Sequence, residues 1–228
     1  MTLCKHEVPV VILCGGRGSR LGEFTDSIPK PMVKVKGVPI IDRIMDNFRA
    51  DGFERFILSA GYKWEVLDEH FKDRLDVEVV FTGLETQTAG RLHGVKDLLG
   101  DTFMACYGDG LTDYRPKELL SIHQSTSPTC TCLVVHPLGR FGELNFNARG
   151  QVTKFSEKPM GDKWINGGYF CFSPSIFDYI HRDTQVLETD VFNMLVRDGE
   201  LFCDSYEGFW HSVDTPKDLA DMEKLLEL

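Results

Sequence analysis

The chain has 228 residues, of which 42% are hydrophobic and 26% charged, and its formal net charge is −10. This length is sufficient for one large domain with its own core, and the acidic balance argues against broad binding to nucleic acid or to an anionic membrane surface. The seven cysteines form no Cys-x-x-Cys pair, and no apolar run approaches 18 residues. We therefore expect a cytoplasmic protein with free thiols, no signal peptide, no zinc site and no membrane span.

Strand and helix patterns alternate along the first 136 residues. Short apolar strands separated by amphipathic helices are typical of βαβ units, so we expect an α/β fold with a Rossmann-like, mostly parallel central sheet flanked by helices. A hairpin around residues 147–150 predicts a small β-rich lobe in the second half, and a further strand is expected after Gly167-Gly168. The other expected strands cover residues 8–13, 56–60, 77–81, 103–107 and 129–136, and the expected helices lie between Pro39 and Gly52 and at 64–71, 92–99, 116–125, 174–181 and 188–198.

A glycine-rich loop follows the first expected strand, in the stretch Gly15-Gly16-Arg17-Gly18-Ser19-Arg20-Leu21. Glycines allow the backbone to approach a ligand closely, and their N–H groups can cradle anionic oxygen atoms. Arg20 and Lys30 add two cations, so the loop suits a polyphosphate. It lacks the Gly-Lys-Ser/Thr ending of a P-loop, and the dinucleotide fingerprint requires a small residue where Leu21 stands. For the glycines alone, a plain tight turn remains an alternative.

Three further charged side chains are candidates for binding a metal ion or a phosphate. Asp109 follows a strand between two glycines, and such a carboxylate can bind Mg²⁺ or simply close a turn. Asp214 can also bind a metal, or it can act as an N-cap for a helix that begins near Pro216. Lys158 lies in a loop and can bind a phosphate or remain solvated.

Two polar turns complete the candidate site. Asn166-Gly167-Gly168 offers an amide and open backbone, which suit either recognition of hydroxyl groups or a turn. The stretch 86–91, Thr-Gln-Thr-Ala-Gly-Arg, enters a helix, and its backbone can contact the edge of a base.

Together these motifs resemble the sugar-phosphate nucleotidyltransferases, whose hallmark is Gly-Gly-x-Gly-Thr/Ser-Arg-Leu followed by Pro-Lys-Pro. In this chain the hallmark covers Gly15 to Leu21 and Pro29 to Pro31. The remaining motifs look most like those of the glucose-1-phosphate cytidylyltransferases. They are Thr88 to Leu92, Tyr107 to Gly110, Gly139 to Gly142, Glu157 to Pro159, Ile165 to Gly168, and Gly208-Phe209-Trp210 ahead of Asp214-Thr215.

The resemblance implies a nucleotide-diphospho-sugar transferase fold in a single domain, 1–228, with a nucleotide-binding half (1–136) and a sugar-phosphate-binding half (137–228). It implies Mg²⁺-dependent transfer from CTP to a sugar 1-phosphate, with α-D-glucose 1-phosphate as the preferred acceptor, and a chain that can form a homo-oligomer. The implied catalytic cations are Arg20, Lys30 and Lys158, and Asp109 and Asp214 would bind Mg²⁺. The implied nucleotide-binding residues are Leu13, Gly15, Gly16, Gly18, Ser19, Thr86, Thr88, Gly90, Arg91 and Gly108, and the implied sugar-phosphate-binding residues are Tyr107, Lys158, Asn166 and Gly167.

Two departures from the pattern stand out: the first bears on how closely the base ring can approach, and the second on the acceptor and the oligomer contacts. Ala89 replaces a glycine that is usual in the base loop, the name we give to residues 86–91. Both the segment from Val80 to Thr86 and the C-terminal tail are shorter than in the cytidylyltransferases. The alternatives are a cytidylyltransferase for another phosphorylated acceptor, a relative that uses UTP, dTTP or GTP, and a catalytically silent nucleotide-sugar sensor. An NAD-dependent oxidoreductase fits least well because of Leu21.

Overall fold

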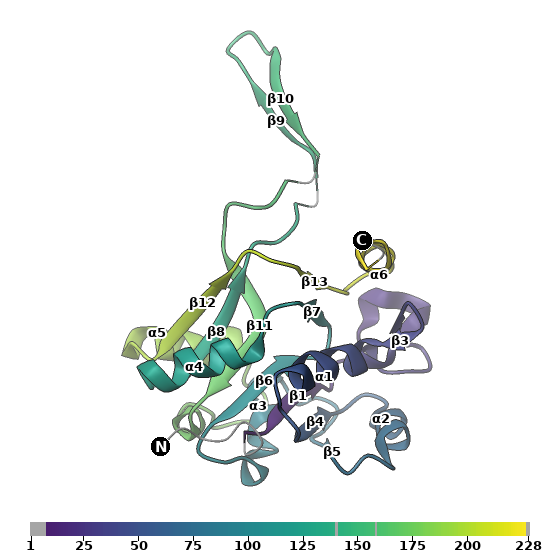
Figure 1. The fold of residues 1–228 in the computed structure, drawn as a ribbon, viewed down its shortest axis with the longest axis vertical. Coiled ribbons are helices and arrows are strands. Elements are labelled where there is room, and N and C mark those ends of the chain that lie inside the picture. The colour runs from purple at the N-terminus through teal and green to yellow at the C-terminus, as the bar shows by residue number, and fades with distance from the viewer. Residues whose placement is uncertain (1–7, 140, 158, 227–228) are drawn as a thin grey trace.

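A seven-stranded sheet forms the centre of the protein (Figure 1). The computed structural model describes residues 8–139, 141–157 and 159–226. The strand order is β12-β8-β11-β6-β1-β4-β5; β11 runs antiparallel to both of its neighbours, and every other neighbouring pair in this sheet is parallel. The expected mostly parallel α/β sheet is therefore confirmed. The strands are β1 Val10–Cys14, β4 Phe56–Ala60, β5 Val77–Phe81, β6 Phe103–Tyr107, β8 Cys130–Val135, β11 Ile165–Phe172 and β12 Leu201–Tyr206.

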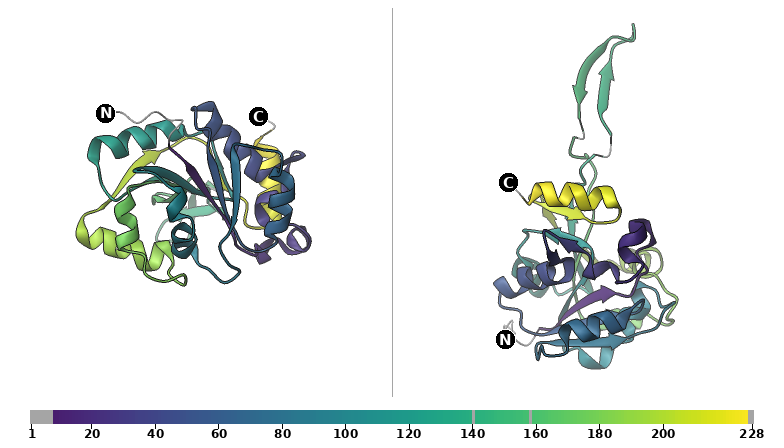
Figure 2. Two further views of the ribbon diagram at one scale, coloured as in Figure 1. Left: turned by 90° about the horizontal axis from the view of Figure 1, so that it is seen from below. Right: turned by 90° about the vertical axis from the view of Figure 1, so that its right-hand side faces the viewer.

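Helices pack on both faces of the sheet (Figure 2). Alternate residues of β1 belong to two separate cores: Val10 and Ile12 pack into one, and Val11 and Leu13 into the other. Successive side chains of a strand point to opposite faces, so a strand that is covered on both faces is apolar throughout. The first core is covered by α1 (Ile40–Ala50), α2 (Trp64–Phe71), α4 (Pro116–Thr126) and α6 (Pro216–Leu225), and the second by α3 (Thr88–His93) and α5 (Phe192–Asp198).

Four expected elements differ from the structure. The helix expected at 92–99 is instead α3, followed by a 3₁₀ turn at Lys96–Leu98, because the first backbone N–H groups of α3 bond to the segment around Asp183 and start the helix earlier. The helix expected at 174–181 is a 3₁₀ turn, Pro174–Asp178, and the one expected at 188–198 begins as a π-helical turn, Leu187–Val191, before α5. Gly167 and Gly168 lie inside β11, where the pairing register shifts and Gly168 adopts a φ of 76°, and do not precede the strand.

The predicted hairpin is confirmed and projects far from the body of the protein (Figure 1). Its strands are β9, Glu143–Phe146, and β10, Val152–Ser156, and we refer to residues 143–156 as the arm. The Asn147 side chain closes the turn by accepting hydrogen bonds from the N–H groups of Arg149 and Gln151. The side chain of Phe146 is 71% exposed and that of Phe155 is 61% exposed. The expected β-rich lobe is thus a single hairpin, and its role in acceptor binding stays a prediction.

No helix in the described part of the chain has the length and apolar character needed to cross a membrane.

Candidate active site

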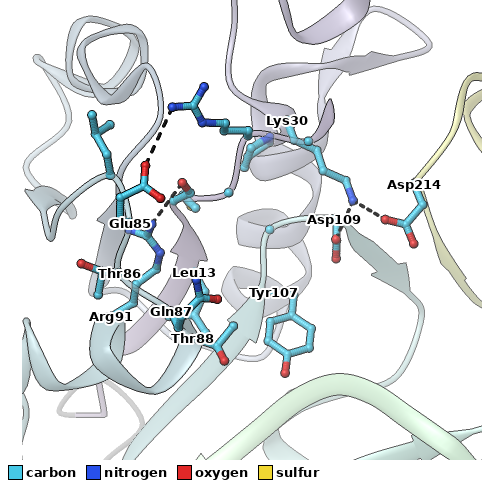
Figure 3. Close-up of a pocket in the computed structure, with 18 of the residues that line it drawn as sticks. Leu13, Lys30, Glu85, Thr86, Gln87, Thr88, Arg91, Tyr107, Asp109 and Asp214 are labelled. Carbon is cyan, nitrogen blue, oxygen red and sulfur yellow. Dashed lines mark hydrogen bonds and ion pairs between the residues drawn. The ribbon is translucent and has the colours of Figure 1, made fainter. Parts of the chain in front are cut away.

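A cavity of about 420 Å³ lies at the carboxyl ends of β1 and β6 (Figure 3). Loops that follow adjacent parallel strands meet at this edge of a sheet, which is where ligands bind in open α/β folds. The residues that the sequence assigns to the site and that line this cavity are Leu13, Gly15, Gly16, Gly18, Arg20, Lys30, Thr86, Thr88, Arg91, Tyr107, Gly108, Asp109 and Asp214.

Lys30 joins the two predicted metal-binding carboxylates. Its Nζ lies 2.7 Å from Asp109 Oδ2 and 2.7 Å from Asp214 Oδ1 (Figure 3). Two short strands, β7 (Gly110–Thr112) and β13 (Trp210–Ser212), pair antiparallel and bring the carboxylates together from distant parts of the chain. Arg20 adds a second cation, with Nη2 3.5 Å from Asp214 Oδ1.

The N-cap alternative for Asp214 is not what the structure shows. Thr215 is the N-cap of α6 and forms a capping box with Asp218, whose side chain bonds back to the Thr215 N–H. Thr215 and Asp218 meet the needs of the helix end. The Asp214 carboxylate instead contacts Lys30 and Arg20 and lines the cavity.

The donor set at this point fits Mg²⁺. No group of three or more His, Cys, Asp or Glu residues that could hold a metal occurs within residues 8–139, 141–157 and 159–226, so a closed protein cage is absent from that part. Mg²⁺ in nucleotide enzymes is bound through one or two carboxylates, while water and substrate phosphates complete its octahedron. Asp109 and Asp214 supply such a pair beside the glycine loop.

The glycine loop is held in place by Gly18, which packs on Lys30, and by the buried side chain of Leu21. Gly18 has a φ of 62°, and a Cβ at this position would lie 2.9 Å from Lys30 Cβ, so the loop packs directly on Lys30. Leu21, the residue that breaks the dinucleotide fingerprint, is fully buried in the first core. The loop continues into 3₁₀ turns at Ser19–Thr25, where a dinucleotide fold would begin a long helix. Ser19 does not line the cavity.

Arg91, which we expected to contact the base, is buried and bonded mainly to backbone carbonyl groups. Only 4% exposed, it donates hydrogen bonds to the carbonyl oxygens of Gly15, Ala60 and Gly83 and to the hydroxyl of Thr82. Burial lowers the pKa of its guanidinium group from the ordinary value. Arg91 therefore ties the glycine loop to the segment before α3, and its role toward the nucleotide stays a prediction.

Gly90 has a packing role. A Cβ on Gly90 would lie 2.3 Å from the carbonyl oxygen of Asp183, so a larger residue would push α3 away from residues 183–188. Gly90 is not among the residues that line the cavity.

A second cavity, of about 300 Å³, adjoins the first and shares Tyr107, Asp109 and Asp214 with it. Asn166 and Gly167, which the sequence assigns to the acceptor, line this cavity. Trp210 donates a hydrogen bond from Nε1 to the carbonyl oxygen of Gly167 at 2.8 Å and forms another part of the wall. Lys158, the remaining residue predicted to bind the acceptor phosphate, lies outside the described residues.

Glu188 was not identified as part of the site from the sequence. Its carboxylate accepts hydrogen bonds from Tyr107 and, at 3.2 Å, from Thr88, which lies 100 positions away along the chain. No local motif marks such a contact, because it depends on how the π-helical turn docks against α3.

Comparisons with known proteins agree with this arrangement. Residues 9–227 match the family model described as nucleotidyl transferase. The chain belongs to this nucleotidyl transferase family. It is 37% identical to the probable glucose-1-phosphate cytidylyltransferase of Bacillus subtilis over 94% of each chain, and 36% identical to the glucose-1-phosphate cytidylyltransferase of Salmonella typhimurium over 95% of each.

Other relatives are named for the transfer of a different nucleotide. The mannose-1-phosphate guanylyltransferase of Mycobacterium tuberculosis is 32% identical, over 96% of this chain and 64% of its own. The crystal structure of HddC from Yersinia pseudotuberculosis superposes with a TM-score of 0.76 over 96% of this chain and 99% of its own, at 24% identity, which supports the fold. The expected family, fold and enzyme class, a nucleotidyltransferase, are thereby confirmed.

Proposed function

We propose that this nucleotidyltransferase converts CTP and a sugar 1-phosphate, with α-D-glucose 1-phosphate as the preferred acceptor, into a CDP-sugar and pyrophosphate. The observation that carries the proposal is the identity of 36–37% to two glucose-1-phosphate cytidylyltransferases along nearly the whole of both chains. The two adjoining cavities, which meet at Tyr107, Asp109 and Asp214, support it because a donor and an acceptor must lie side by side.

The reaction requires no general base. The acceptor phosphate is already an anion, so one of its oxygens attacks the α-phosphorus of the nucleotide, a new P–O bond forms, and the bond to the bridging oxygen of pyrophosphate breaks. The main barrier is the repulsion between two anions together with the charge that grows on the leaving group. Preorganised cations lower that barrier, and catalysis consists of positioning and electrostatic stabilisation.

The positions of the side chains support the roles that we propose for them. Lys30 is 13% exposed at its side chain, and its ammonium group is fixed by two carboxylates, so it offers a preorganised charge to the phosphates. Arg20 is 71% exposed at the rim, where it can close on a bound triphosphate. Asp109 and Asp214 would hold Mg²⁺, which when bound neutralises phosphate charge and helps to align the attack. Lys158 would contact the acceptor phosphate, as its sequence motif predicts.

A coupled assay of pyrophosphate release tests the proposal. CTP, UTP, dTTP and GTP would each be offered with glucose 1-phosphate and with mannose 1-phosphate, with and without EDTA. We expect the highest kcat/KM for CTP with glucose 1-phosphate and no release in EDTA. A preference for another nucleotide would overturn the assignment of CTP, and nucleotide binding without any release of pyrophosphate would favour a sensor.

We also propose that the chain forms a homo-oligomer in the cytoplasm. The apolar residues exposed on the arm support an association between copies, because an isolated two-stranded hairpin is marginally stable in water. The free cysteines of the described chain suit a reducing compartment. Sedimentation of the wild type against an arm variant, Phe146→Ser with Phe155→Ser, tests the oligomer.

A further inference from the structure

We infer that Glu188 is a positioning residue that fixes the base loop and Tyr107 relative to one another, and so sets the geometry between the nucleotide and the acceptor. Glu188 itself lines neither of the two cavities, and we assign it no contact with substrate. The inference rests on the proposed function, since it assumes that the two cavities bind the donor and the acceptor.

The two oxygens of Glu188 have different partners. Oε1 accepts a hydrogen bond from the hydroxyl of Tyr107, and Oε2 accepts one from Thr88 Oγ1 at 3.2 Å. Thr88 Oγ1 in turn accepts a hydrogen bond from the backbone N–H of Leu187 at 2.8 Å. One carboxylate therefore joins a side chain of the base loop to a side chain at the end of β6.

Both partners face substrate space. Thr88 lines the larger cavity beside the glycine loop, and Tyr107 lines both cavities. Figure 3 shows Tyr107 below Asp109, on the side of the cavity where Thr88 also lies. A shift of the Tyr107 ring would change the boundary between donor and acceptor, and positional errors of this kind are costly in reactions that depend on alignment.

The segment that carries Glu188 is itself firmly docked. The N–H groups of Gln87 and Ala89 donate hydrogen bonds to the carbonyl oxygens of Asp183 and Gln185, at 2.8 and 3.1 Å. The Gln185 side chain is buried, and it closes its own turn by accepting from the N–H of Arg182 at 2.9 Å. The segment that precedes Glu188 is therefore fixed against the start of α3. Charge-assisted hydrogen bonds that hydroxyl groups donate to such a carboxylate are stronger than bonds between neutral groups.

Kinetics of Glu188→Ala test the inference. We expect the KM for the nucleotide and the KM for the sugar phosphate each to rise about tenfold, since losing one charge-assisted hydrogen bond changes an equilibrium by roughly that factor or more. Thr88→Val should raise mainly the KM for the nucleotide, and Tyr107→Phe mainly the KM for the acceptor. Glu188→Gln keeps one acceptor oxygen and should recover part of the loss.

The chain offers a matched control in Asp204, whose carboxylate accepts a hydrogen bond from the buried Tyr114 hydroxyl at 2.6 Å. Asp204→Ala removes the same kind of bond, but it lies outside both cavities, so it should lower thermal stability and leave both KM values within twofold of the wild type. Equal kinetic losses in Asp204→Ala and Glu188→Ala would show a general structural effect and overturn the inference. Unchanged KM values in Glu188→Ala would overturn it as well.

The nucleotide used would be the one that the wild type turns over best in the four-nucleotide panel, and its dissociation constant would also be measured by calorimetry. A preference for UTP or GTP would contradict the proposed use of CTP, and the kinetics of Glu188→Ala with that nucleotide would still test the role of Glu188. If Glu188→Ala does not fold, Thr88→Val and Tyr107→Phe each remove one of its two contacts. In the double variant the losses should be less than additive, because one carboxylate joins both contacts. Fully additive losses, or KM values that stay at the wild-type level in all three variants, would overturn the inference.

Discussion

Lys30 and Asp214 lie 184 positions apart in the chain, yet Lys30 Nζ is 2.7 Å from Asp214 Oδ1. The same ammonium group is 2.7 Å from Asp109, so one lysine is shared between two carboxylates. Lys30 alone offsets one of the two negative charges, and Arg20, with Nη2 3.5 Å from Asp214 Oδ1, offsets the other. The two carboxylates also orient the ammonium group before any substrate binds.

Replacement of Lys30 by alanine should therefore abolish most of the activity. We expect kcat/KM for pyrophosphate release to fall by about 10²-fold or more, by analogy with other preorganised charge stabilisers. Lys34→Ala is the control and should retain near-normal rates, because the Lys34 side chain is exposed on the short strand Lys34–Val35 that follows. Near-normal turnover by Lys30→Ala, measured in the coupled assay, would contradict the assigned role.

Asp109→Asn should weaken the dependence on magnesium. An amide keeps the shape of the side chain but removes half of the negative charge that Asp109 and Asp214 offer to a cation, so more Mg²⁺ should be needed for half-maximal rate. A titration of the rate with Mg²⁺ measures this shift. Asp113→Asn is the control, because Asp113 bonds to the Tyr206 hydroxyl outside both cavities. Equal Mg²⁺ requirements for wild type and Asp109→Asn would argue against the metal site.

Two neighbouring glycines should differ in how their replacement by alanine affects stability. A Cβ at Gly15 would lie 1.7 Å from Cζ of Arg91, whose guanidinium group is buried and bonded on several sides, so Gly15→Ala should lower the free energy of unfolding by about 1–3 kcal/mol. A Cβ at Gly16 meets nothing within 4 Å, so Gly16→Ala should leave stability nearly unchanged. Urea denaturation of both variants decides the point; equal stabilities would show that Arg91 yields easily.

His123 makes stability depend on pH. It is 2% exposed, with Nδ1 2.9 Å from Thr131 Oγ1 and Nε2 3.0 Å from Ser173 Oγ. Burial lowers the pKa of His123 from 6.5 to about 4. The folded protein therefore keeps the ring neutral, while the unfolded chain takes up a proton below pH 6.5, so the contribution is fully present above that pH and is lost as the pH falls toward 4.

From these pKa values, the free energy of unfolding should drop by about 2 kcal/mol between pH 7 and pH 5 through His123 alone. Urea titrations at the two pH values, with wild type and His123→Gln, measure the difference. The variant should be less stable at pH 7 and should show a smaller loss on acidification. A loss of the same size in both proteins would mean that other groups cause it.

Much of the architecture could be predicted from local patterns. The strands at 56–60, 77–81 and 103–107 and the helix at 64–71 were expected within their observed bounds, because buried strands read as apolar runs and an amphipathic helix has a clear period. The start of α3 could not be predicted, since it is set by hydrogen bonds from Gln87 and Ala89 to residues almost a hundred positions away. Long-range partners override local propensity in such short helices.

The candidate site shows the same division. The glycine loop, Lys30 and Asp109 were apparent because each sits next to a recognisable strand end or proline turn. The contacts of Arg91 and the part played by Glu188 were not, since both depend on tertiary docking of α3 and the π-helical turn. Sequence identified which residue types gather at the edge of the sheet, and only the structure gives their partners.

The antiparallel direction of β11 has a consequence for how this fold can diversify. Val135 at the end of β8 pairs with Ile165 at the start of β11, so the segment between them, which carries the arm, leaves and rejoins the sheet beside the second cavity. Such an insertion can change in length and sequence without interrupting any strand of the seven-stranded sheet. Grafting residues 136–164 from one relative onto another would thus be a modular way to alter the surroundings of the second cavity while the sheet and the glycine loop stay intact.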